Sequence, residues 1–281
     1  MVDLTQQVLR LTGATSAVPI AGGHQADVFD VMSASGRRIV AKVLDSSVVD
    51  EYEATERITA VAELADLDER VCAPVPIDGR LVNTIDHDGQ SRMVLCFDFA
   101  EGAAFDVTRP VDAELMGSTL AGLHRSLARL GPRHIPELAA LKATGGVGDS
   151  GPVQLLHGDF NADNLRRAGA QVRVFDFEDC GYGPPSFEIA NTLYMVLFSA
   201  TVDGQVETFP WFEDALLSGY ASGAVGDIDR SAVDRFIDLR VRALGSWLDD
   251  LSTAPVGIRN ASPAWHGTLR AFVDRYAPRT D

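Results

Sequence analysis

The feature that most constrains this chain is a pair of polar motifs separated by a short strand pattern. The motifs are His157-Gly-Asp159-Phe-Asn-Ala-Asp-Asn164 and Phe175-Asp176-Phe-Glu178-Asp179. Residues 172–175 alternate in polarity as a β-strand does, so the chain can form a hairpin that returns the second motif to the first. A fold that contains this stretch must gather carboxylates and an amide at one place.

These groups are the ones that phosphoryl transfer from a nucleotide requires. Asp159 is positioned to orient a hydroxyl and accept its proton, while Asn164 and Asp176 supply oxygen ligands for magnesium at the phosphates. Glu178, at i+2 from Asp176, points the same way on an extended chain and is expected to assist a second magnesium. His157 invites a general-base interpretation, but its place just before Asp159 favours a structural role in bracing the loop. The sequence therefore predicts a kinase active centre.

Lysine usage gives a second, independent indication. Lys42 and Lys142 are the only lysines in the chain, and every other basic residue apart from histidine is arginine. Lys42 lies in the strand pattern at residues 40–43, where a compact ammonium suits the α- and β-phosphates of ATP. We expect an acid of the following helix to hold it, and choose Glu53 over Glu56 because the helical register then turns Glu53 inward.

The order of the other patterns predicts an α+β fold with two lobes. A Gly22-Gly23 turn, expected to cover the triphosphate with its N–H groups, precedes a hairpin within residues 18–44. A charged helix follows at residues 49–67, then strands near residues 81–85 and 92–99. These elements form a small antiparallel lobe (1–98), joined by a linker (99–106) to a mostly helical lobe (107–281). The second lobe contains the catalytic loop (155–165) and the metal motif (175–179).

Charge and cysteine content narrow the partners and the compartment. A net charge of -16, from 40 acids and 24 bases, argues against nucleic acid and anionic membranes and permits a cationic substrate. Cys72, Cys96 and Cys180 show no paired spacing, which favours free thiols in a reducing compartment. The first residues lack a signal-peptide pattern and no apolar run is long enough to span a bilayer, so we expect a cytoplasmic protein. The oligomeric state is not readable from the sequence.

Taken together, the two motifs resemble those of the aminoglycoside phosphotransferase family, which includes antibiotic kinases and choline-, homoserine- and methylthioribose-type kinases. The resemblance extends over nearly the whole chain, from the lysine strand at residues 40–44 to the helix motif Leu-Ala-Gly-Leu-His124. It implies a protein-kinase-like fold that binds ATP or GTP between its lobes, with adenine against the backbone near Phe97 and Phe99. It also implies a loop-bracing acid, usually aspartate, at the position of Glu188, where the charge is kept.

The acceptor is expected to be a small molecule. Pro184-Pro185 and a helical pattern begin within about ten residues of Asp176, which leaves no room for the activation segment that seats a peptide. We expect a cationic antibiotic as acceptor, with a metabolic amino alcohol such as choline or homoserine as the alternative. The acids and aromatics of the helical lobe offer Asp249, Asp250 and Trp247 as acceptor contacts. A nucleotide-binding pseudokinase is the alternative from another class.

Overall fold

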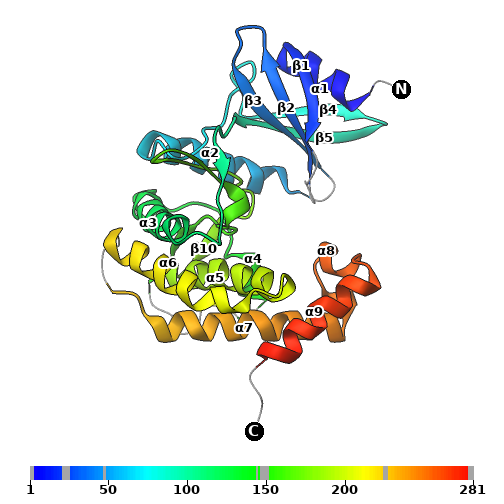
Figure 1. Ribbon diagram of the computed structural model, residues 1–281. Coiled ribbons are helices and arrows are strands. Elements are labelled where there is room, and N and C mark those ends of the chain that lie inside the picture. The colour runs from blue at the N-terminus through cyan, green and yellow to red at the C-terminus, as the bar shows by residue number, and fades with distance from the viewer. Residues whose placement is uncertain are drawn as a thin grey trace. The chain divides into compact units, whose positions relative to one another are not determined.

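The computed structural model describes residues 3–20, 26–46, 49–143, 145, 152–223 and 227–277. The chain divides into two compact units. The first unit comprises Met1–Ala103, Leu130–Ile135 and Leu165–Glu178, and the second comprises Ala104–Arg129, Pro136–Asn164 and Asp179–Asp281. Both units are drawn in Figure 1, coloured along the chain.

The first unit is built on a five-stranded antiparallel sheet in the order β1-β2-β3-β5-β4. In chain order the strands are β1 (Ala14–Ile20), β2 (Ala26–Ser33), β3 (Arg38–Asp45), β4 (Val82–His87) and β5 (Gln90–Asp98). Alternation along β3 sends Ala41 and Val43 into a core with Val8 of helix α1 (Leu4–Thr12). The same alternation places Lys42 on the opposite face of the sheet. The predicted hairpin and later strands are confirmed, whereas α1 and β1 were not foreseen.

Helix α2 (Glu51–Leu67) covers the face of the sheet that carries Lys42. It begins at Asp50, whose side chain accepts a hydrogen bond from the N–H of Glu53 at 2.9 Å, as an N-cap residue does. Ala54 and Ile58 of the helix pack with Leu44 and with the β5 residues Met93 and Leu95. The helix predicted at residues 49–67 is therefore present, and its apolar side is fixed on the sheet.

A second hairpin belongs to the first unit, although it lies far along the chain. Strands β8 (Leu165–Ala168) and β9 (Gln171–Val174) pair with each other. The backbone of Val174 bonds the carbonyl of Arg70 at 2.8 Å and the N–H of Cys72 at 2.9 Å. Residues 130–135 are held in the same unit by an ion pair between Arg133 and Glu63. The observed division thus differs from a simple split at residues 99–106.

The second unit is mostly helical. Its elements are β6 (Ala103–Ala104, at the boundary), α3 (Pro110–Leu127), α4 (Ala139–Lys142), β7 (Gln154–Leu156), η1 (Ala162–Asn164), β10 (Gly181–Gly183), α5 (Pro185–Val202), η2 (Val206–Thr208), α6 (Phe209–Gly223), α7 (Arg230–Asp249), η3 (Leu251–Thr253), α8 (Val256–Arg259) and α9 (Pro263–Tyr276). Helices α3 and α6 approach closely because Gly117 and Gly219 face backbone of the other helix, where a Cβ would collide. Helices α5, α7 and α9 share an apolar cluster that includes Tyr194, Leu244 and Phe272 (Figure 1).

Two further expectations concern the cysteines and the membrane. Cys72, Cys96 and Cys180 are all buried free thiols. Burial raises the pKa of Cys96 to about 12, so this thiol stays protonated and inert at neutral pH. Across the described ranges, no helix is both long enough and apolar enough to cross a bilayer.

Candidate active site

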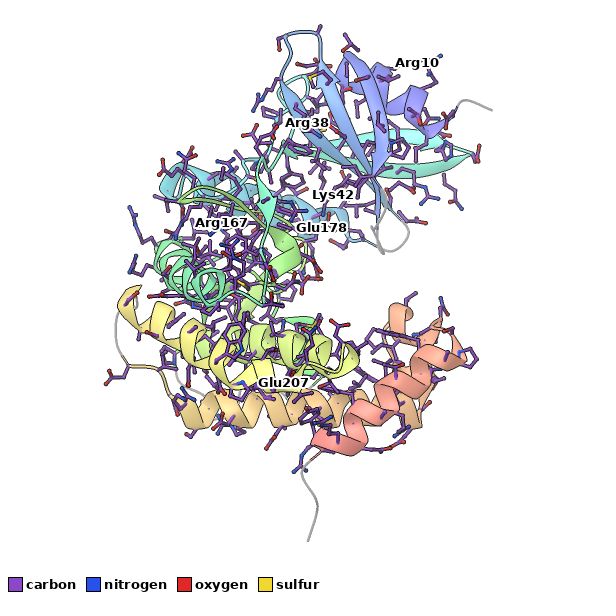
Figure 2. The ribbon with its side chains drawn as sticks, viewed as in Figure 1. Arg10, Arg38, Lys42, Arg167, Glu178 and Glu207 are labelled. Carbon is purple, nitrogen blue, oxygen red and sulfur yellow. The ribbon has the colours of Figure 1, made fainter. Side chains whose placement is uncertain are left out.

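Lys42 lies between two carboxylates of the second motif, all within the first unit. Its Nζ is 2.7 Å from Oδ1 of Asp176 and 2.9 Å from Oε1 of Glu178. Figure 2 labels Lys42 and Glu178, which lie close together there. The β8–β9 hairpin ends at Val174, so the chain delivers these acids directly to the face of the sheet from which Lys42 projects. The sequence placed each residue in the site but did not predict that they would pair.

The ammonium of Lys42 is stabilised in its charged form. Its side chain is only 12% exposed, and this burial by itself would lower the pKa of Lys42. The negative charges of Glu178 and Asp176 outweigh burial, so the pKa of Lys42 is raised. At neutral pH the group is therefore a fixed cation beside two anions.

The backbone of Asp176 is in an unusual conformation. Its φ is 69°, in the left-handed region that residues other than glycine seldom adopt. Aspartate and asparagine tolerate this region better than most residues, because a short polar side chain can bond locally. The neighbouring Phe177 is buried and anchors this turn. Strain of this kind is typical of functional turns, since packing elsewhere holds the residue in place.

The expected partner of Lys42 on helix α2 is not the one observed. Glu53 instead pairs with Arg57 at 3.2 Å, one turn further along its own helix. Glu56, the alternative, accepts a hydrogen bond from the N–H of His134 at 3.2 Å. The reason is the register of α2: with Ala54 and Ile58 turned to the sheet, the local i,i+4 pair is available to Glu53.

The other residues expected to contact nucleotide fall into two groups. Gly22 and Gly23 lie outside the described residues. Phe97 is in β5, paired with Val40, and the ring of Phe99 is covered by the guanidinium of Arg38 at 3.5 Å from its centroid. The backbone of the intervening Asp98 already donates to the carbonyl of Ala73 at 2.9 Å.

In the second unit, Glu188 fixes the loop that carries Asp159. Its carboxylate accepts hydrogen bonds from the N–H of His157 at 3.2 Å and of Gly158 at 2.5 Å. Glu188 stands in the first turn of α5, and His157 and Gly158 directly follow strand β7. Gly158 has a φ of 93°, and a Cβ there would collide with the carbonyl of Asp179. The loop therefore requires glycine at this position.

His124 completes the support of Glu188 from helix α3. Its Nε2 is 2.8 Å from Oε2 of Glu188, and its Nδ1 is 2.8 Å from the hydroxyl of Tyr220. Burial alone would raise the pKa of Glu188, but the hydrogen bond and charge of His124, with His157 and the N–H of Gly158, hold it below its usual range. Glu188 is thus a buried, charged carboxylate that holds the Asp159 loop in place.

His157 contributes through its ring as well as its backbone. The N–H of Asp159 donates to Nδ1 of His157 at 3.3 Å, so this nitrogen acts as an acceptor. The ring is fully buried and meets Phe160 edge-on. These contacts fit a histidine that orients the loop carrying Asp159. They do not fit a proton acceptor for a bound alcohol.

Asn164 is oriented by Asp159, which lies five residues earlier in the same loop. Its Nδ2 donates to the carbonyl of Asp159 at 2.9 Å and to Oδ2 of Asp159 at 3.0 Å. Because both partners are acceptors, the amide orientation is fixed and Oδ1 is turned away from them. Oδ1 makes no hydrogen bond to another described residue and is available as a metal ligand.

Each unit offers oxygen atoms of the hard type that Mg²⁺ prefers together with phosphate oxygens. Asp176 and Glu178 belong to the first unit, and Asn164 belongs to the second. In the described part of the chain, no group of three or more His, Cys, Asp or Glu side chains could hold a metal by itself. This fits an ion that protein and nucleotide bind together, because Mg²⁺ at phosphates takes few protein ligands.

The residues expected to contact the acceptor have local partners. Asp249 pairs with Arg270 at 2.8 Å. Asp250 accepts a hydrogen bond from the N–H of Ser252 at 3.0 Å at the start of η3, and Trp247 packs at the rim of the apolar cluster of α5, α7 and α9. These contacts explain the three residues without assigning them to an acceptor site.

Two residues near the catalytic loop were missed by the sequence reasoning. Tyr220, in α6, gave no signal because its contact with His124 spans 96 residues. Arg240, in α7, did leave a signal in the sequence, because it interrupts an apolar helix face formed by Val233, Phe236 and Leu244. Its guanidinium lies over the ring of Tyr194, 5.0 Å from the centroid.

Comparison with known protein families finds one match. Residues 132–224, which include the Asp159 loop and the Asp176 turn, match the profile of the Phosphotransferase enzyme family. The resemblance expected from the motifs is therefore confirmed, and with it an enzyme that phosphorylates hydroxyls of small molecules. No curated protein matches this chain.

Solved structures show the fold. An amicoumacin kinase in complex with AMP-PNP and Ca²⁺ matches at a TM-score of 0.75 and 16% identity, covering 98% of this chain and 93% of that one. A microcompartment-associated aminopropanol kinase matches at a TM-score of 0.71 and 18% identity, covering 96% of this chain and 93% of that one. A spectinomycin phosphotransferase in complex with ADP and spectinomycin matches at a TM-score of 0.59 and 13% identity, covering 98% of this chain and 94% of that one. The predicted kinase-like α+β fold is confirmed.

Proposed function

We propose that this phosphotransferase moves the γ-phosphoryl group of ATP, or of GTP as the alternative donor, to a hydroxyl of a small, positively charged molecule. The observation that carries the proposal is the pair formed by Asp159 and Asn164. One amide bonds both the backbone and the carboxylate of Asp159, which fixes the base and turns Oδ1 of Asn164 outward. A loop organised in this way holds Asp159 in position to orient an alcohol.

The transfer is a single displacement. The hydroxyl oxygen attacks the γ-phosphorus, the bond from phosphorus to the β,γ-bridging oxygen breaks, and ADP leaves with that electron pair. The hydroxyl proton passes to the carboxylate of Asp159 and then to water. Lys42 stabilises negative charge on the phosphates throughout, because it is held protonated by its acidic neighbours. The backbone near Phe97 and Phe99 is the proposed adenine contact.

Magnesium is the proposed metal. Asn164, Asp176 and Glu178 would hold it, and it would neutralise phosphate charge and align the γ-phosphoryl group. The oxygen-only donor set and the outward Oδ1 of Asn164 support this assignment. The solved structures with AMP-PNP, Ca²⁺ or ADP support a nucleoside triphosphate as donor.

For the acceptor, an antibiotic with amino groups is the first candidate. The net charge of -16 favours a cation, and an amicoumacin kinase and a spectinomycin phosphotransferase share the fold. A metabolic amino alcohol is the second candidate, supported by the fold shared with an aminopropanol kinase. A pseudokinase that binds nucleotide without transfer is the third.

The deciding experiment measures ADP release with Mg²⁺ and ATP across aminoglycosides, cationic peptide antibiotics, choline and homoserine. Asp159→Ala should abolish transfer while nucleotide binding is retained, because the change removes the base but leaves Asn164 its hydrogen bond to the backbone carbonyl of residue 159. The exposed Asp274→Ala on α9 serves as the control. Unchanged turnover in Asp159→Ala would contradict the proposal, and nucleotide binding without transfer to any alcohol would favour the pseudokinase.

A further inference from the structure

Helix α5 contacts the Asp159 loop at a second point, through the hydroxyl of Thr192. This side chain is fully buried, and its hydroxyl donates to the carbonyl of Phe160 at 2.7 Å. Phe160 directly follows Asp159 in the chain. The contact lies entirely within the second unit. It therefore ties α5 to the backbone immediately after the proposed base.

The hydroxyl of Thr192 has a second acceptor within reach. This acceptor is the carbonyl of Glu188, four residues earlier in the same helix, at 3.0 Å. A threonine inside a helix commonly bonds its i−4 carbonyl, so that contact alone would carry no functional meaning. The carbonyl of Phe160 is the closer of the two, and a hydroxyl supplies a single proton. The loop is therefore the favoured acceptor.

Glu188 and Thr192 hold the chain on opposite sides of Asp159. Glu188 accepts the N–H of Gly158, and Thr192 donates to the carbonyl of Phe160. The two helix residues are one turn apart on the same face of α5, about 6 Å along the helix axis. Between residues 158 and 160 an extended chain spans at most about 7 Å, so one helical turn matches the spacing of the two loop groups. A single rigid element thus fixes the loop before and after the base.

We propose that Thr192 is a positioning residue for phosphoryl transfer, which holds the loop backbone so that the carboxylate of Asp159 keeps the direction that the reaction requires. The inference rests on the proposed role of Asp159 as the base and adds a second anchor to the one that Glu188 provides. Asn164 fixes the carboxylate from within the loop, whereas Thr192 fixes the loop against α5. Because a misplacement of about 1 Å at the reacting groups can cost about 100-fold in rate, loss of the anchor acts on kcat.

Thr192→Val tests the anchor, because it removes the hydroxyl and keeps a β-branched side chain. With Mg²⁺, ATP and the acceptor that gives turnover, kcat should fall roughly tenfold while KM for ATP stays within about twofold. Thr192→Ser keeps the hydroxyl and should retain kcat within about threefold. Thr201→Val is the matched control on the same helix and should retain the wild-type kcat. The hydroxyl of Thr201 bonds the carbonyl of Leu197 at 2.7 Å and the hydroxyl of Tyr276 at 3.2 Å instead of the loop.

Two further measurements separate positioning from folding. Amide hydrogen exchange of residues 157–164 requires no acceptor: its protection should fall roughly tenfold in Thr192→Val and stay at the wild-type level in Thr192→Ser and Thr201→Val. In a double variant with Asp159→Ala, Thr192→Val should change the residual rate by less than about twofold, because the base that it positions is already absent. If Thr192→Val fails to fold, Thr192→Ala replaces it, with circular dichroism as the check on folding.

Three results would overturn the inference. One is a folded Thr192→Val in which either kcat or the exchange of residues 157–164 matches the wild type. Another is an equal loss in Thr192→Val and Thr192→Ser, which would assign the effect to packing and not to the hydroxyl. The third is an undiminished effect of Thr192→Val in the Asp159→Ala background. Failure of the proposed function is a different result, namely no Asp159-dependent transfer to any alcohol while exchange still depends on the hydroxyl; the anchor then stands without its catalytic role.

Discussion

The Nε2 of His124 on helix α3 lies 2.8 Å from Oε2 of Glu188 at the start of helix α5. Glu188 also accepts the N–H groups of His157 and Gly158, so one buried carboxylate joins two helices to the loop that carries Asp159. Buried ion pairs are weak evidence for stability in themselves, but removing one member leaves polar groups without partners. Glu188 is therefore a positioning residue for Asp159.

Replacing Glu188 by Gln should lower the free energy of unfolding by about 3 kcal/mol, because the charge is lost while His124 and two N–H groups stay buried. Urea denaturation followed by circular dichroism measures the change. Glu207→Gln provides the control, since Glu207 is exposed on η2 and labelled in Figure 2. Equal stability of the two variants would show that the Glu188 network does not support the loop.

The same carboxylate predicts a dependence of stability on pH. The pKa of Glu188 is lowered in the folded protein, so its charged form contributes stability above the unfolded value of about 4.3. This contribution is lost as pH falls through the lower folded pKa. The difference in unfolding free energy between wild type and Glu188→Gln should be constant near neutral pH and shrink below about pH 4. A difference that grows on acidification would contradict the charged state of Glu188.

Gly158→Ala should destabilise the protein by about 2 kcal/mol or more, because the new Cβ meets the carbonyl of Asp179 and φ is 93°. Gly169→Ala is the matched control: Gly169 also has a positive φ, 64°, but a Cβ there meets nothing within 4 Å. Thermal unfolding of the two variants isolates the collision from the backbone strain. Similar losses in both would show that the loop at Gly158 yields to the added atom.

Lys42→Met should reduce transfer roughly 100-fold or more, since the carboxylates of Asp176 and Glu178 lose their cation and the phosphates lose theirs. Lys42→Arg should recover little, because the guanidinium fork differs in shape from an ammonium held between two acids. The change is measured as kcat/KM for ATP with the acceptor that gives turnover. Lys142→Met, at the other lysine of the chain and exposed on α4, should leave the rate unchanged.

Local patterns made the first unit predictable. Alternation along residues 38–45, the cap at Asp50 and the apolar side of α2 are each decided within a few residues. The ion-pair partners of Lys42 could not be predicted in this way, because two local rules compete for Glu53. A helix-start acid can reach a neighbouring strand or the Arg57 of its own next turn, and in the structure it pairs with Arg57.

Contacts between distant segments account for what the sequence did not predict. Tyr220 meets His124 across 96 residues, and Glu188 meets His124 across 64, with no pattern to relate them. Arg240 was detectable in principle as a charge within an apolar helix face. The contact between Arg240 and Tyr194 was not detectable from the sequence, since it depends on how helices α5 and α7 pack together.

The division of the chain into units has a consequence for protein engineering. The backbone passes from one unit to the other at residues 103–104, 129–130, 135–136, 164–165 and 178–179. Truncation after Ala103 would therefore remove from the first unit the hairpin and the acids that accompany Lys42. Chimeras that exchange a whole lobe between relatives at a single junction would separate residues that fold together, so viable exchanges must transplant residues 130–135 and 165–178 along with residues 1–103.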